Sequence, residues 1–564
     1  MIIDNIIELI QKTENAQVLL TKNIEGNKSL KKYNEVISVE TELSLNEGLR
    51  TIQLYIALKE PSSVYLPKIF IDERCYEDIK FIPHVNDDFS ICIVDESENY
   101  FFREKDLPTI TLDLISKAKA ILRDKDDAAY CQEEFEREFS AYWNINYDEK
   151  KVLQEIGLCL IDFINFDNIK AVKFLSNFGQ FQYLVYNLEE DFKQLENYLK
   201  IRNIKFKEIE VFISDYENVH PPLRINCNES IKYIRNQEDF KRKVNKLSQS
   251  DFIVIFKTKY DELYGWLYPL LDKNVKGYRS HTHWQYLQSS ISEKKVVERL
   301  SFSNISQRRL DIRTSGIELD RNLSVAIIGL GSVGSNLLHF LTKYPISKYY
   351  LIDPDILKVE NVFRNNFGFN FISRFKTKIS EQFILSKNPF TEILTYEKDI
   401  CVALNDDKLI LEKYDVRFII LGVTRVEKYL LQHLISVNSE KPVIMMWVEP
   451  YLASGQLIYI QPDDLEKALE LIKNYPYHVL EEGQSFLLKE GSCQTSYLPY
   501  SEANLTLFLS SINSFLYQLL IKKELKDSKV LTWIGDLEII KRMNINISDN
   551  YNLSDSFKII ENEF

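Results

Sequence analysis

Residues 325–364, VAIIGLGSVGSNLLHFLTKYPISKYYLIDPDILKVENVFR, combine residue types that suit nucleotide chemistry. Gly329, Gly331 and Gly334 follow an apolar predicted strand and lead into a predicted helix. Such glycines allow a tight turn and a close approach to phosphate, while the free N–H groups and dipole of the helix N-terminus attract an anion. An acid about 20 residues past the glycines usually bonds a ribose hydroxyl, and Asp353 fits that position. The spacing predicts a nucleotide site in this part of the chain.

The residues after this acid indicate the reaction. They are Asn361 and Arg364, followed by Lys376 a dozen residues ahead of Asn388-Pro389. Glycine loop, acid, Asn-x-x-Arg, Lys and Asn-Pro in this order resemble the E1/ThiF/MoeB adenylation family. The resemblance implies that a protein C-terminal carboxylate attacks the α-phosphate of ATP, giving an acyl-adenylate and pyrophosphate. The acid would hold the ribose, and Arg364 and Lys376 would hold the negative charge of the transition state.

Two parts of the implied ATP site are less regular. The family usually carries an Asp after its fourth strand that helps to bind magnesium, and that position falls on Thr424 in LGVTRVEK. ATP and Mg²⁺ are still expected as cofactors. The ligand of Mg²⁺ would then come from elsewhere, such as Glu449 or the phosphates alone, or the activity would be reduced. An arginine ahead of the nucleotide strand can also reach ATP in this family, sometimes across a dimer. Arg309 and Arg313 are the candidates, Arg313 being assigned to the site, and a solvated basic arm explains them equally well.

Two of the seven cysteines stand where a nucleophile is expected. Cys493 in EGSCQTSYLPY resembles the E1 cysteine that takes the acyl group as a thioester on a loop over the adenylate. Cys92 ends PHVNDDFSIC, and with His84 and Asn86 it resembles the H-x-N…C pattern of an E2 ubiquitin-conjugating fold. A thiolate is nucleophilic near neutral pH and forms a transferable ester. The resemblance implies that His84 or Asn86 supports the oxyanion when an amine attacks, and the other five cysteines are expected to be structural.

The elements around Cys92 are predicted from hydrophobic periodicity. Residues 1–20 have the apolar spacing of an amphipathic helix, and three strand-like runs between 35 and 71 predict an antiparallel meander. The polar stretch 83–92 follows, and helices are expected over 111–124 and 133–145. Together these elements make a compact α+β unit that fits the E2 resemblance.

The remainder of the chain is predicted to hold a connector and a nucleotide-binding half. Residues 150–270 have α/β character without recognisable chemistry, and the polar, charged segment 272–322 is expected to be a linker or an extended arm. From about 323 onward strands alternate with helices, which indicates a mainly parallel sheet. The fold class is multidomain α/β and α+β: an E2 (UBC-like) domain over 1–148, an α/β linker domain over 149–300 and an E1/ThiF Rossmann-like adenylation domain over 301–564.

An E2-like domain followed by an E1-like domain resembles the E2–E1 fusion proteins that accompany CD-NTases in CBASS anti-phage operons. The resemblance implies that the chain conjugates the C-terminus of a CD-NTase to lysine amines of target proteins. It also implies a JAB-type isopeptidase that reverses the bond, and a homodimer formed through the E1 domains. None of these partners is visible in the sequence itself.

Composition limits the remaining possibilities. The 564 residues are 45% hydrophobic and 27% charged, which is ordinary for a globular protein of several domains. A net charge of −13 argues against generic affinity for nucleic acid or membranes, and no apolar run is long enough to span a bilayer. The N-terminus lacks a basic signal region, and no C-x-x-C pair occurs, so a cytoplasmic chain with free thiols and no zinc site of the usual spacing is expected.

Three other functions stay open. The chain could activate a sulfur carrier or a bacterial ubiquitin-like protein in place of a CD-NTase. It could be a nicotinamide-dependent oxidoreductase, although a hydride transfer needs no cation pair such as Arg364 and Lys376. It could be a degenerate binding module, which only Thr424 in place of an acid favours.

Overall fold

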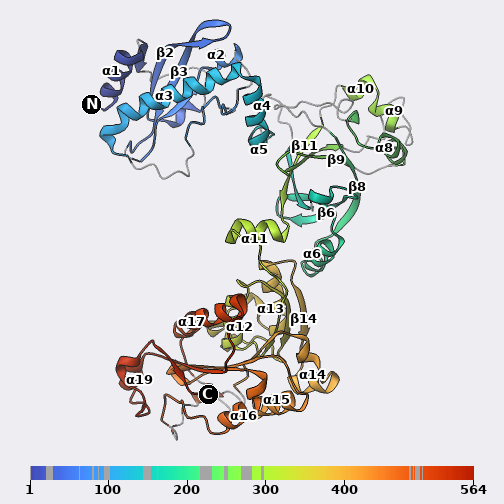
Figure 1. Cartoon of the computed structure of the whole chain (residues 1–564), viewed down its shortest axis with the longest axis vertical. Helices are drawn as coiled ribbons and strands as arrows, with labels where there is room; N and C mark the ends of the chain where they lie inside the picture. The colour runs from blue at the N-terminus through green and yellow to red at the C-terminus, as the bar shows by residue number, and fades with distance from the viewer. Residues whose placement is uncertain are drawn as a thin grey trace. The chain divides into compact units, whose positions relative to one another are not determined.

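The computed structural model describes residues 2–564 except 15, 21–28, 63, 79–81, 87, 95–101, 144–153, 162, 216–230, 247–251, 269–282, 294–296, 423, 482–483, 485, 487, 490–495 and 498. The chain divides into two compact units (Figure 1). One unit holds Met1–Asn187 and Lys205–Ile305, and the other holds Leu188–Ile204 and Ser306–Phe564. The candidate residues around Cys92 and those around the glycine loop therefore belong to different units.

The N-terminal sheet is the predicted antiparallel meander. Its strands lie in sequence order: β1 Gln17–Leu20, β2 Glu35–Leu45, β3 Gly48–Leu58 and β4 Lys68–Ile71. Helices α1 (Ile2–Glu14) and α3 (Leu107–Arg123) pack against each other and share one apolar core with the sheet. The prediction of a single helix over 1–20 is wrong, because Val18 pairs with Val39 and extends the sheet by one strand.

A closed barrel follows the meander in the same unit. Its seven strands run in the order β10-β11-β5-β7-β6-β8-β9. Their bounds are β5 Gln154–Leu160, β6 Lys170–Phe178, β7 Phe181–Tyr186, β8 Phe206–Ile213, β9 Phe252–Lys257, β10 Leu263–Tyr268 and β11 Glu298–Asn304. Short helices accompany them in the described part of this region: α8 (Gln237–Val244), α9 (His283–Leu287) and α10 (Ser290–Glu293). Because the barrel is closed, each strand pairs with a neighbour on both sides and none is an edge. This explains why so many of the strand residues are buried.

The prediction of a linker or arm over 272–322 is wrong where the structure describes that segment. Residues Glu298–Asn304 form β11, which pairs with both β10 and β5 inside the barrel. Residues Gln307–Ser315 form helix α11, which belongs to the second unit. The charged side chains of ERLSFSN hid a strand whose Leu300 is fully buried.

The second unit is built on an eight-stranded sheet in the order β14-β13-β12-β15-β16-β17-β20-β21. The bounds are β12 Leu323–Ile328, β13 Ile346–Ile352, β14 Glu392–Tyr396, β15 Val416–Ile419, β16 Val443–Val448, β17 Ser454–Ile460, β20 Lys529–Ile534 and β21 Ile559–Asn562. The first five in spatial order are parallel, and the last three are antiparallel. The mainly parallel sheet predicted from 323 onward is therefore confirmed.

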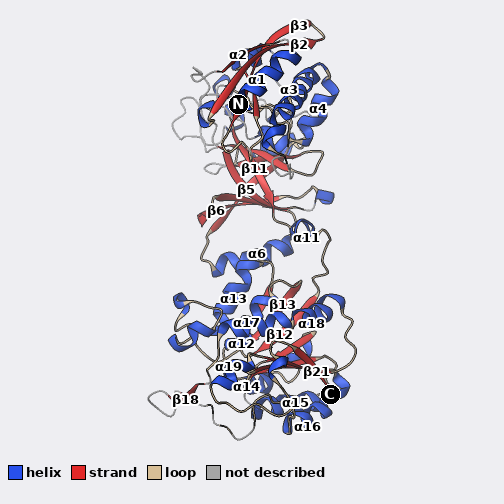
Figure 2. Ribbon diagram, turned by 90° about the vertical axis from the view of Figure 1, so that its left-hand side faces the viewer, coloured by secondary structure: helices blue, strands red, loops and turns tan. Residues whose placement is uncertain are grey.

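Helices cover both faces of this sheet (Figures 1 and 2). One face carries α12 (Ser332–Leu341), α13 (Lys376–Lys387), α17 (Glu502–Ser511) and α18 (Asn513–Tyr517), and the other carries α14 (Ile400–Asp406), α15 (Thr424–Ser436) and α16 (Leu465–Lys473). Val325 and Ile327 point into the first layer, while Ala326 and Ile328 point into the second. Burial on both faces explains the uninterrupted apolar strands.

Helix α6 (Glu189–Ile201) is encoded between barrel strands β7 and β8 but belongs to the second unit. In the described ranges no single helix has both the length and the apolar character to cross a bilayer. One bent pair of helices, Glu502–Ser511 with Asn513–Lys522, is together long and apolar enough, by length and composition alone.

Candidate active sites

The glycine loop lies where β12 leads into α12. Gly329 has φ +99°, and a Cβ there would lie 2.2 Å from the Ile420 carbonyl oxygen. A Cβ on Gly334 would lie 2.0 Å from the carbonyl oxygen of Gly329. Gly331, the residue before α12, has open space where a Cβ would be. Two of the glycines thus let backbones touch, and the third leaves room at the helix N-terminus, as a bound phosphate requires.

These glycines give a matched pair of substitutions. Gly334→Ala is expected to lower the free energy of unfolding by about 1–3 kcal/mol, because its Cβ must displace a backbone carbonyl. Gly331→Ala is expected to leave the melting temperature unchanged, because its Cβ meets nothing within 4 Å, and instead to weaken ATP binding by filling the cradle. Thermal unfolding with and without ATP separates the two effects. Equal melting temperatures for the two variants would contradict this geometry.

Asp353 fastens the glycine loop to the end of β13. Its carboxylate accepts the N–H of Leu330 at 2.6 Å and the N–H of Asp355 at 2.8 Å. The side chain is buried, and burial raises the pKa of Asp353 above its usual range, with the nearby charge of Lys376 opposing the rise. A perturbed buried acid in this position is a candidate for function as well as for loop geometry.

Lys376 begins α13 and turns back towards the same acid. Its Nζ donates to Asp355 at 2.7 Å and lies 3.8 Å from the nearer oxygen of Asp353. The backbone repeats the link, because the Lys376 N–H donates to the Asp355 carbonyl at 3.0 Å. The Lys376 side chain is 8% exposed, and two carboxylates balance its charge, the buried Asp353 and the exposed Asp355. The structure thus brings two predicted site residues, Asp353 and Lys376, together.

Arg364 ends a 3-10 turn, Val359–Arg364, that also contains Asn361. Its carbonyl accepts hydrogen bonds from the Ser332 hydroxyl and, at 3.3 Å, from Asn336 Nδ2, both on the first turns of α12. Its guanidinium lies 5.7 Å from the centre of the Tyr500 ring. The Asn-x-x-Arg segment is therefore bound to the helix that starts at the glycine loop.

A cleft of about 360 Å³ opens at the carboxyl ends of the central strands, where ligands bind in open α/β sheets. Its lining includes Gly331, Ser332, Thr424, Glu427, Glu449 and Tyr500. Tyr500 connects the cleft to Arg364, whereas Asp353 and Lys376 are not among its lining residues. Arg313 is exposed on α11 and likewise is not part of the lining.

Two carboxylates line the cleft near Thr424, the position that is usually an acid in this family. Glu427, one helical turn later on α15, is buried and accepts the Gly422 N–H at 3.0 Å. Glu449 accepts from the backbone N–H groups of Val479 and Leu480 and contacts His478 Nδ1 at 2.8 Å. Both oxygens of Glu449 are thus engaged in holding the chain at 478–480, and Glu427 is a second carboxylate in the lining of the cleft.

Cys92 lies at the end of a small hairpin in the first unit. Val85 pairs with Ile91, and the hairpin docks on β4 through the N–H of Ile91, which donates to the Ile69 carbonyl at 2.8 Å. The Cys92 N–H donates to the His84 carbonyl at 2.7 Å, and the cysteine is exposed. The exposed thiol is available to a second protein, as a conjugating nucleophile must be.

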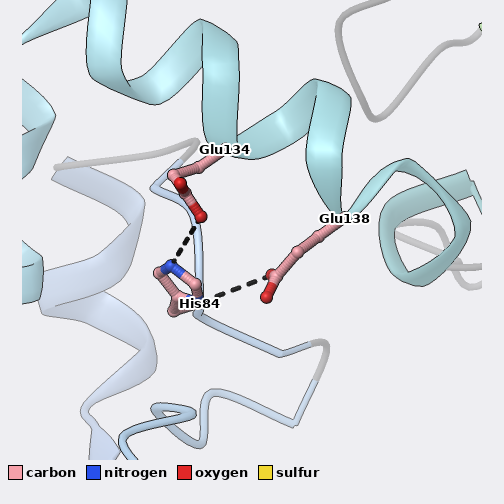
Figure 3. A group of neighbouring side chains, drawn as sticks. All are labelled: His84, Glu134 and Glu138. Carbon is pink, nitrogen blue, oxygen red and sulfur yellow. Dashed lines mark ion pairs between the residues drawn. The ribbon is translucent and has the colours of Figure 1, made fainter. Parts of the chain in front are cut away.

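The two predicted partners of Cys92 have different surroundings. The Asn86 amide donates to the Ser90 hydroxyl at 2.9 Å and so closes the hairpin. The His84 ring lies between the carboxylates of Glu134 and Glu138, each 3.4 Å from one ring nitrogen (Figure 3). The backbone of His84 therefore contacts Cys92, whereas the His84 ring contacts Glu134 and Glu138.

The other cysteines give no second candidate among the described residues. Burial raises the pKa of the Cys131 thiol, and burial together with Asp399 raises that of Cys401 to about 11. Cys159 is buried in the barrel. Cys227 and the predicted nucleophile Cys493 lie outside the described residues.

Several site residues escaped the sequence analysis. Neither Tyr500 nor Glu427 is a residue that the sequence analysis assigned to the site. Glu134 and Glu138 are separated by four residues, a spacing that places two side chains on one helix face, but nothing in the sequence points them at His84. Their roles depend on contacts between distant parts of the chain.

Comparison with known proteins follows the same division. Residues 19–152 match the model of prokaryotic E2 family B, and residues 306–469 match the model of the ThiF family. The chain is 30% identical to ubiquitin-like modifier-activating enzyme 5 of Dictyostelium discoideum over 116 residues, which are 20% of this chain and 30% of that protein. The chain thus spans less than a third of this curated relative.

Matches among solved structures include PaaA, at 14% identity and a TM-score of 0.29, and E. coli MccB crystallised with ATP, at 16% identity and a TM-score of 0.26. In each case the match covers 43% of this chain and 64% of the other. The chain is a fusion of an N-terminal domain of prokaryotic E2 family B with a C-terminal domain of the ThiF family.

Proposed function

We propose that this chain uses ATP to activate the C-terminus of a partner protein and then conjugates it to an amine. The observation that carries the proposal is the union of two domains in one polypeptide: a ThiF family domain with an intact glycine loop, and an E2 family domain with an exposed cysteine. An activating site and a conjugating nucleophile are the two halves of a ubiquitin-like transfer.

In the first step a C-terminal carboxylate oxygen forms a bond to the α-phosphorus of ATP, and the bond to pyrophosphate breaks. The open space at Gly331 and the free N–H groups of α12 suit the phosphates. Arg364 and Lys376 would stabilise the charge that builds on the phosphate. Mg²⁺ would be held by the phosphates and by Glu427, which lines the cleft where the usual acid is missing.

A second cavity offers the partner's tail a path to this cleft. Its volume is about 830 Å³, its lining includes residues 541, 545–549 and 551–553, and it shares Tyr475 and His478 with the cleft. A C-terminal peptide lying there would end at the nucleotide. Because Glu449 holds His478 at the junction, the two cavities keep a common wall.

The later steps pass the acyl group from the adenylate to two thiols in turn and then to an amine. The Cys493 sulfur attacks the acyl-adenylate and AMP leaves, and the Cys92 sulfur then takes the acyl group and releases Cys493. A target amine, supplied by a lysine, attacks the Cys92 thioester and forms an amide while the thiolate leaves. With both carriers in one chain, the effective concentration of the second thiol is on the order of millimolar.

The partner we propose is a CD-NTase in anti-phage defence, with a JAB-type isopeptidase as the opposing enzyme and a homodimer formed through the ThiF domains. This part of the proposal derives from the order of the two domains. A sulfur carrier or a bacterial ubiquitin-like protein is the alternative substrate with the same first step.

Purified protein incubated with Mg-ATP and a candidate CD-NTase tests the proposal on a non-reducing gel. We expect an ATP-dependent adduct that thiols cleave, together with ATP–pyrophosphate exchange. Exchange without any adduct would instead favour activation of a sulfur carrier. Absence of both, with tight NAD binding, would favour the oxidoreductase.

A further inference from the structure

Helix α5 (Phe139–Trp143) belongs to the barrel core on one side. Phe139 and Trp143 are buried, and their rings lie 4.5 Å and 5.5 Å from the ring of Tyr264 on β10. Trp143 Nε1 donates to the Leu300 carbonyl at 3.0 Å, and Arg299 donates to the Trp143 carbonyl at 2.7 Å. These bonds to β11 fix the helix to the barrel.

The same helix reaches the Cys92 hairpin on its other side. The Tyr142 hydroxyl accepts the backbone N–H of His84 at 2.5 Å and donates to Glu138 at 3.1 Å. Glu134 on α4 (Ala128–Arg137) and Glu138 at the C-cap of that helix face the two ring nitrogens of His84 (Figure 3). Both the backbone and the ring of His84 are thus held by residues 134–142.

The geometry identifies a clamp for the imidazole ring. Nε2 lies 3.4 Å from the Glu134 carboxylate and Nδ1 lies 3.4 Å from the Glu138 carboxylate, so each ring nitrogen contacts its own acid. His84 also has φ +65°, a conformation that a non-glycine residue keeps only when its surroundings hold it. The contacts with Tyr142 and the two acids supply that hold.

We propose that Tyr142, Glu138 and Glu134 are positioning residues for the nucleophile: by clamping His84 they fix its carbonyl, which accepts the Cys92 N–H, and so couple the barrel to the conjugating thiol. The inference rests on the proposed function of Cys92. It gives the barrel a role in the transfer step, because the helix that holds His84 is anchored in the barrel core.

Hydrogen exchange of the full chain, followed by mass spectrometry, tests the clamp without any partner. Tyr142→Phe and Glu138→Gln are expected to speed exchange in peptides covering 84–92 by roughly tenfold. The matched control is Glu133→Gln, an exposed acid of the same helix that should leave these peptides unchanged. Unchanged exchange in both clamp variants would overturn the proposal, whether or not Cys92 carries a thioester.

Single-turnover discharge of the Cys92 thioester to free lysine tests the catalytic consequence. Glu138→Gln should lower the maximal discharge rate by roughly tenfold and leave the half-saturating lysine concentration unchanged. Added to His84→Asn it should cause no further loss, because Glu138 acts through His84. Additive losses, or an equal loss in Glu133→Gln, would overturn the proposal. A wild-type chain that forms no thioester would refute the proposed function alone, since hydrogen exchange still reports on the clamp.

Discussion

Lys376→Ala is expected to slow ATP–pyrophosphate exchange by about 10²–10³-fold, the usual cost of removing one preorganised group that stabilises transition-state charge. Lys376 is already fixed beside Asp353 and Asp355 at the start of α13, so its position needs little rearrangement when ATP binds. Exchange measured with saturating partner peptide and radiolabelled pyrophosphate gives the rate. The effect should fall on the rate more than on the affinity for ATP, because the charge grows only in the transition state.

Lys378→Ala is the matched control. Lys378 lies on the same turn but is half exposed and bonds to Thr395 and Glu381, so its loss should change the rate by less than about twofold. Thermal unfolding of both variants checks folding, because Lys376→Ala leaves the buried Asp353 with less compensation. If the two lysine variants exchange pyrophosphate equally fast, Lys376 does not hold the phosphate.

Cys92→Ala is expected to abolish amide conjugates while leaving adenylation intact. Since the two sites belong to different units, the substitution should not alter ATP–pyrophosphate exchange. The partner should then accumulate as a thiol-sensitive adduct on Cys493, because the next acceptor is missing. A reducing gel reports the amide, and a non-reducing gel reports the thioester.

Cys75→Ala serves as the control in the same unit, because Cys75 is a half-buried thiol on α2 (Glu73–Asp78) that packs against the N-terminal core. It should conjugate at the wild-type rate. Amide conjugates formed by Cys92→Ala at an undiminished rate would mean that the amine attacks an earlier intermediate, and the E2 domain would then act only in binding.

The nucleotide half could be predicted well from sequence because its signals are local. The glycines, Asp353 and the Asn-x-x-Arg lie within 40 residues of each other, and each residue type is demanded by a backbone contact or a charge. The uninterrupted apolar strands also follow directly from a sheet that is covered on both faces. Such features need no knowledge of distant parts of the chain.

The barrel could not be predicted in this way. Its seven strands join residues 154 to 304, and β11 pairs in parallel with β5 across most of that length. Periodicity identifies a strand but not the strand that pairs with it. The charged residues at the start of β11 also kept this segment from being recognised as a strand. The contact between Tyr142 and His84 likewise depends on the packing of α5 against the barrel strands β10 and β11.

The departure of Thr424 from the family pattern was only partly informative about the site. Thr424 was identified as a departure from the family, but the acid that lines the cleft, Glu427, lies one helical turn further on. A helix places residues three apart on one face, so the shift is physically simple, yet it is invisible until the start of α15 is known. Tyr500 became a site residue only through its contact with Arg364.

The assignment of α6 to the second unit has a consequence for synthesis of the chain. Translation proceeds at ~5–20 residues per second, so Leu188–Ile204 leaves the ribosome roughly 5–20 s before Ser306 does. During that interval α6, which buries Phe192, Leu195 and Leu199 in the folded chain, exists without the rest of its unit. The remaining barrel strands, β8 to β11, are made in the same interval. A polypeptide consisting of 306–564 alone would be made without that helix, and its folding would differ from that of the full chain.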